Sequence, residues 1–258
     1  MIEKKIRAQA REKLNGKWPL MLAAMFTMIA LGYLAFLYFE VILMFGNVWD
    51  ADGKLKPDSA PFLLLTIAVT VAFIFMFSPV KNGLYRLIFN AANNRETEFY
   101  DLFYYFKKGR YARTLGFNIV LTLLKLLKCY ICFIPYNALN IIKSVNFSTE
   151  SVPAMDIALT LLFAAGVTGS ILLLLKYFIS EFLYTEDDNI GFQTNLQITN
   201  HIIKRHRGDV YMLWCSFLPW FALCFFVLPA FYVIPYALTS SAVSAKWLLK
   251  LYKEGRMI

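Results

Sequence analysis

The stretch LGFNIVLTLLKLLKCYICFIPYNALNII, Leu115–Ile142, is the part of the sequence that decides the fold. It is almost wholly apolar, and it exceeds the roughly 20 residues that a helix needs to cross the ~30 Å hydrocarbon core of a bilayer. Two lysines, Lys125 and Lys128, nevertheless stand near its centre. The stretch therefore predicts a membrane-crossing helix that carries an unusual polar feature.

Other blocks of the same kind extend this prediction to the whole chain. Hydrophobic residues make up 59% of the sequence and charged residues 17%, whereas soluble domains average about 45–50% and about 25%. The last block, 210–252, is too long for one crossing, and proline at Leu228-Pro229 favours a turn there. We expect an all-α, polytopic membrane helix bundle that forms a single domain over 1–258. Its six predicted spans are 18–45, 60–80, 115–142, 153–184, 210–227 and 230–252.

The distribution of Lys and Arg predicts the orientation. The predicted inner segments and adjoining helix ends hold 21 of the 26 Lys and Arg, and the predicted outer loops hold 3. Positive charge collects on the cytoplasmic side of membrane proteins, so we expect both termini to be cytoplasmic. The net charge of +9 then reflects membrane topology, and no nucleic-acid partner is expected.

Three segments have the pattern of amphipathic helices on the inner face. Residues 1–17 carry six Lys and Arg beside an apolar stripe at Ile2, Ile6, Ala10 and Leu14, which is typical of a helix that lies on anionic lipid. Residues 82–110 combine a helical apolar face with Tyr and Phe. Residues 189–206 follow the acids of EDDN (186–189) and end with basic residues. We expect each of these segments to lie at the interface.

A polar stripe runs along the predicted third span. Its members recur every three or four residues and therefore share one helix face. They are Asn118, Thr122, Lys125, Cys129, Cys132 and Tyr136, with Lys128 beside the line. A charge at the centre of a membrane helix costs about 2.5–3.5 kcal/mol, so such a face is expected to lie against other helices or a cavity.

The sequence leaves two main interpretations of this stripe open. In the first, the lysines pair with acids of other spans, for which the candidates are Glu40, Asp156 and Glu181, although none is clearly level with Lys125. In the second, the stripe lines a cavity, with Lys125, Lys128, Asn118, Thr122 and Tyr136 as candidate ligand-binding residues. The ligand would then be an anion such as a lipid phosphate or a carboxylate. Lysine side chains that reach up to the interface are a third possibility.

Signals of catalysis are weak. The Cys129 and Cys132 pair lies inside a predicted span rather than in a soluble redox context, and His201 and His206 match no metal-binding spacing. We expect neither an enzyme nor a metal or cofactor site.

Four segments resemble a family of bacterial integral membrane proteins, domain-of-unknown-function family 975, and more loosely the membrane regions beside glycerophosphodiester phosphodiesterases. They are IRAQAREKLNGKW (6–18), NGLYRLIFNAANNRETEFYDLFYYFKK (82–108), YTEDDNIGFQTNLQITNHIIKRHRGDVYMLWCSFLPW (184–220) and VIPYALTSSAVSAKWLLKLY (233–252). The chain departs from the family pattern at Thr199-Asn200 and Pro219-Trp220. The resemblance implies a six-span protein of a bacterial cytoplasmic membrane and implies no activity.

The expected function is non-enzymatic binding of an anionic lipid or amphipathic anion in an intramembrane cavity. A small transporter or pore subunit is one alternative, because prolines interrupt several predicted spans. An accessory subunit that docks a partner at the inner face is another. Expected partners are therefore anionic membrane lipids, and a second copy or another membrane protein.

Overall fold

The computed structural model describes residues 2–46, 60–146, 153–226 and 228–255, and every regular element in these ranges is a helix. In chain order they are α1 (Ile2–Leu14), α2 (Trp18–Gly46), α3 (Ala60–Ala92), the 3-10 helix η2 (Phe99–Phe106), α4 (Tyr111–Asn146), α5 (Pro153–Leu175), α6 (Phe178–Glu186), α7 (Phe192–Leu223) and α8 (Ala230–Lys253). The all-α prediction is confirmed for these residues. Residues 47–59 of the predicted first outer loop lie outside the described ranges.

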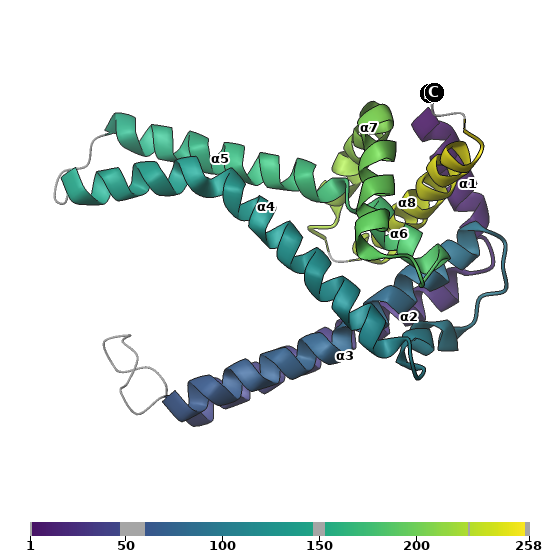
Figure 1. Cartoon of the computed structure of the whole chain (residues 1–258), viewed down its shortest axis with the longest axis horizontal. Coiled ribbons are helices and arrows are strands. Elements are labelled where there is room, and N and C mark those ends of the chain that lie inside the picture. Colours follow the sequence, from purple (N-terminus) through teal and green to yellow (C-terminus); the bar gives the residue numbers. More distant parts are fainter. Residues whose placement is uncertain (1, 47–59, 147–152, 227, 256–258) are drawn as a thin grey trace.

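Four stretches are long and apolar enough to cross a membrane: Trp18–Val41, Leu64–Ala92, Tyr111–Ser144 and Ala154–Glu186. Helix α2 pairs with α3 and α4 pairs with α5, and both pairs project away from the remaining helices (Figure 1). Their apolar side chains face outward, since Leu64, Leu127 and Leu161 are 67%, 63% and 66% exposed. Such a surface is compatible with lipid tails, which are as apolar as leucine.

The best-packed core lies at the end of the molecule from which these pairs project. There α1, α6, α7 and α8 pack against the start of α2 and the end of α3. Helix α8 is the central element, because every residue of its segment TSSAVSA, 239–245, is at most 5% exposed. Small side chains let neighbouring helices approach closely, which explains why this serine-rich helix is buried.

The predicted inner segments come together at this end. Lys253 Nζ lies 2.6 Å from Glu186 Oε1, and Arg110 Nε lies 3.0 Å from Asp188 Oδ2. Lys17 Nζ donates a hydrogen bond to the backbone oxygen of Arg95 at 3.3 Å. Four basic segments that are far apart in the sequence therefore share one region.

The interfacial helices differ from their predicted form. Three of the four residues of the apolar stripe of α1 pack into the protein core rather than on lipid, since Ile6, Ala10 and Leu14 are at most 5% exposed, whereas Ile2 is 37% exposed. The segment 82–110 is divided between the end of α3 and η2. The segment 189–206 continues into the predicted fifth span as one helix, α7, which loses helical geometry only at His206 (φ −116°, ψ 30°).

The last two predicted spans, which correspond to the second half of α7 and to α8, differ from the first four in composition. Within the residues that the structure describes, α7 and α8 are not among the helices apolar enough to cross a membrane by composition. The physical reason is visible in their sequences, since α7 begins with a polar half and α8 carries the buried serine-rich segment. The four long apolar helices are shown, and the crossing of α7 and α8 remains a prediction.

A close approach between α3 and η2 depends on Gly83. A Cβ added at Gly83 would lie 1.9 Å from the backbone oxygen of Leu102, a residue that is fully buried. Since that neighbour is backbone, it cannot rotate away. The absence of a side chain at position 83 therefore lets η2 pack against α3.

Gly83→Ala is expected to destabilise the detergent-solubilised protein by about 3 kcal/mol, the upper end for overpacking. Gly116→Ala is the matched control, because nothing lies within 4 Å of a Cβ there. Alanine at an unhindered helix position stabilises by about 0.5–1 kcal/mol relative to glycine. Thermal unfolding midpoints followed by circular dichroism measure both, and equal midpoints for the two variants would contradict the close approach.

Candidate functional site

The polar stripe of α4 faces several helices in turn. Asn118 donates a hydrogen bond to Ser78 Oγ of α3 at 2.7 Å, and the ring of Tyr136 packs edge-on against Phe163 of α5 with centroids 5.6 Å apart. Cys132 lies close to Gly169 of α5. The stripe is therefore a packing face, with the two lysines in its middle third.

Lys125 reaches a buried carboxylate on α6. Its Nζ lies 2.5 Å from Glu181 Oε1, and Lys81 Nζ of α3 lies 3.0 Å from the same oxygen. The Glu181 side chain is 3% exposed, whereas the side chains of Lys81 and Lys125 are 29% and 21% exposed. One carboxylate thus forms ion pairs with two ammonium groups, so the three side chains together carry a net charge of one positive unit.

A second lysine pair surrounds Tyr177, in the break between α5 and α6. Lys128 Nζ donates a hydrogen bond to the Tyr177 hydroxyl at 2.5 Å. The ammonium groups of Lys128 and Lys176 lie 5.2 and 5.1 Å from the centre of the tyrosine ring, within the range of cation–π attraction. Neither lysine has an acidic partner within 4 Å among the described residues.

These residues form one cluster, which we call the lysine cluster: Lys81, Lys125, Lys128, Lys176, Tyr177 and Glu181. Four positive charges and one negative charge meet where α3, α4, α5 and α6 approach each other. Sequence reasoning missed Lys81, Lys176 and Tyr177 as members, because Lys81 and Lys176 were assigned to inner helix ends. The available signal was the position of Lys81 directly after the predicted span 60–80 and of Lys176 inside the predicted span 153–184.

A cavity of about 340 Å³ opens beside the cluster, between α3 and α4. Its polar part consists of Ser78, Lys81, Asn118 and Thr122. The remaining wall is apolar, with Phe73, Phe77, Ile119, Leu123 and Leu126. Asn118 Oδ1 is buried and lacks a hydrogen-bond partner among the described residues. Two predicted ligand-binding residues, Asn118 and Thr122, therefore do line a cavity.

The other candidate acids lie elsewhere. Asp156 contacts Lys143 near the far end of the α4–α5 pair, and Glu40 is exposed on α2. Cys129 and Cys132 are free thiols. His206 Nδ1 lies 3.0 Å from Asp209 Oδ2 on its own helix, and no group of three metal-ligating side chains occurs in the described part of the chain.

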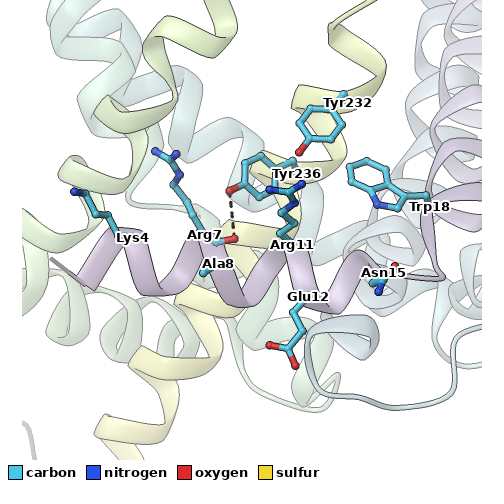
Figure 2. A pocket seen from close by; sticks show the side chains of 9 residues that line it. All are labelled: Lys4, Arg7, Ala8, Arg11, Glu12, Asn15, Trp18, Tyr232 and Tyr236. Atoms are coloured by element: carbon cyan, nitrogen blue, oxygen red, sulfur yellow. Dashed lines mark hydrogen bonds between the residues drawn. The ribbon is translucent and has the colours of Figure 1, made fainter.

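A larger pocket, of about 850 Å³, lies between α1 and α8 (Figure 2). Lys4, Arg7 and Arg11 point into it from α1, and Tyr232 and Tyr236 of α8 face them (Figure 2). Trp18, the first residue of α2, stacks on Tyr232 with ring centroids 5.0 Å apart. This pocket is separate from the lysine cluster and shares no residue with it.

Residues 1–249 match a family model described as a protein of unknown function, DUF975. Neither a curated protein nor a solved structure matches the chain.

Glu181→Gln is expected to destabilise the protein by about 3 kcal/mol, because two ammonium groups would face each other without a counter-charge. Glu40→Gln changes the formal charge equally at an exposed position and is expected to leave the unfolding midpoint unchanged. Thermal unfolding of the detergent-solubilised proteins measures both. Equal midpoints for Glu181→Gln and the unmodified protein would show that the carboxylate does not hold the lysines.

Proposed function

The chain belongs to the DUF975 family, which has no assigned function, and on that premise we propose that it is a non-enzymatic membrane protein that binds an anionic amphiphile at the lysine cluster. The observation that carries the proposal is the imbalance of four lysines against one carboxylate beside an apolar cavity. The ligand class is a lipid with a phosphate or carboxylate headgroup.

The charge imbalance favours an anion for a physical reason. A charged group that leaves water loses several kcal/mol of solvation, and only a nearby opposite charge restores it. Glu181 neutralises one lysine of the four, and Lys128 and Lys176 both contact Tyr177, which carries no charge. A bound anion supplies the missing negative charge.

The adjoining cavity fits the rest of an amphiphile. Lys81 and Asn118 lie at its polar side, so a headgroup placed there would contact an ammonium group and an amide. Phe73, Leu123 and Leu126 would contact the acyl chain. Its ~340 Å³ is at the small end of ligand pockets, which suits one headgroup and the first part of a chain.

We further propose that the protein lies in a bacterial cytoplasmic membrane with both ends inside. The four basic segments that meet at one end of the structure support this orientation, because cytoplasmic loops concentrate Lys and Arg. Four or six crossings both return the chain to the side on which it began.

A small transporter is the second candidate, and the breaks at Lys176–Tyr177 and His206 favour it. Interrupted helices beside charged groups are typical of transporter binding sites. Ligand flux into proteoliposomes separates the two functions, since a binding protein retains its lipid without net transport.

Lys81→Gln is expected to weaken phosphatidylglycerol binding about tenfold, the loss typical of one charged hydrogen bond. Leu123→Trp, which fills the apolar wall without a change in charge, is expected to weaken it as well. Native mass spectrometry of the detergent-solubilised protein, titrated with the lipid, measures both. The matched control is Lys143→Gln, whose lysine contacts Asp156 far from the cavity. Binding that is equal in all four proteins would exclude the cavity as the site.

A fusion of green fluorescent protein to the C-terminus is expected to fluoresce in bacterial cells, and an alkaline phosphatase fusion truncated after Lys143 is expected to be active. A phosphatase fusion truncated after Arg110 is the matched inactive control. Phosphatase activity of the Arg110 fusion would contradict the proposed orientation.

A further inference from the structure

The basic residues of α1 are gathered on one face of the helix. Lys4, Arg7 and Arg11 are separated by three and four residues, so they project from the same side. The apolar stripe of α1 is buried in the protein core, which fixes the rotation of the helix. The basic face is consequently held toward α8, and α1 cannot rotate to present it to another surface (Figure 2).

Contacts with α8 and α2 shape the pocket around this face. The Tyr236 hydroxyl donates a hydrogen bond to the backbone oxygen of Arg7 at 3.2 Å, and this bond ties the middle of α1 to α8. The stacked rings of Trp18 and Tyr232 form the opposite end of the pocket. The volume of about 850 Å³ lies within the usual range for small-molecule sites.

The pocket offers hydrogen-bond donors and positive charge with little to balance them. Arg7 Nε is buried without a hydrogen-bond partner among the described residues, and its guanidinium group lies 5.7 Å from the Phe217 ring centre. Glu12 is the one acidic residue at the rim, and its carboxylate points away from the three basic side chains in Figure 2. Like charges on one helix face destabilise it, so an anion between them would stabilise the arrangement.

We propose that this pocket is a second, discrete binding site, which takes a phosphate group that carries about two negative charges. Each arginine has a planar guanidinium group that can donate two parallel hydrogen bonds to phosphate oxygens, and the lysine adds a compact positive charge on the same face. Trp18 begins the first membrane-crossing stretch, and tryptophan and tyrosine are enriched where a membrane meets water. A lipid headgroup and a soluble phosphate compound present the same group here.

Binding in this pocket can be distinguished by mutation from simple attraction of a basic helix to anionic lipid. A basic helix adsorbed on a membrane responds to total charge, whereas this pocket responds to which basic residues are changed. Lys5 and Lys13 provide the matched test, because they lie on α1 and do not line the pocket.

The test uses the full chain in detergent and isothermal titration calorimetry. One probe is inorganic pyrophosphate and the other is dioctanoyl phosphatidic acid. One equivalent of each probe is expected to bind saturably at this pocket, and phosphatidic acid is expected to bind at the lysine cluster as well. Arg7→Gln/Arg11→Gln should weaken binding at this pocket by about tenfold or more, whereas Lys5→Gln/Lys13→Gln should leave it nearly unchanged. Arg11→Gln alone alters an exposed side chain and should show a smaller loss in the same direction, without risk to folding.

The two probes identify the source of the phosphate group. Binding of both, with competition between them, assigns the site to the phosphate group itself, and binding of phosphatidic acid alone assigns it to a lipid headgroup. Lys81→Gln should bind both probes at this pocket as the unmodified protein does, which separates this site from the lysine cluster. Absence of saturable binding, or an equal loss in the Lys5/Lys13 variant, would overturn the proposal.

Discussion

The carboxylate of Glu181 is the point on which the arrangement of the long helices depends. It is buried on α6 and accepts from lysines of α3 and α4, so a single side chain links both helix pairs. Burial of an ion pair contributes little net stability when its desolvation is counted, but removal of the central charge is strongly destabilising. The interaction therefore specifies how α3, α4 and α6 meet more than it stabilises the fold.

Much of the helical fold could be predicted from the sequence, because long apolar blocks with charged ends have few other physical solutions. The partner of Lys125 could not be identified in the same way. If both predicted spans were straight helices, none of the candidate acids, Glu181 included, would be clearly level with Lys125. The chain instead breaks at Lys176–Tyr177, and α4 bends along its length (Figure 1), so heights estimated from straight helices no longer apply.

Helices α1 and α8 show a second limit of sequence reasoning. An apolar stripe on a basic helix predicts that one face is shielded from water, but the pattern does not distinguish lipid from protein as the cover of that face. In α1 the stripe at Ile6, Ala10 and Leu14 meets protein. In α8 the serine-rich segment 239–245 has low hydropathy and yet every residue in it is at most 5% exposed, because small side chains matter there more than apolar ones.

The central position of α8 has a consequence for biosynthesis. The pairs α2–α3 and α4–α5 consist of neighbours in the sequence, so each can form as soon as its second helix has been made. The core that surrounds 239–245 needs α8, which follows every other described helix in the sequence, and this core therefore closes only after α8 has been made. Until then the apolar stripe of α1, which is made before α8, lacks its main partner, and apolar surface exposed in this way makes a nascent chain prone to aggregate.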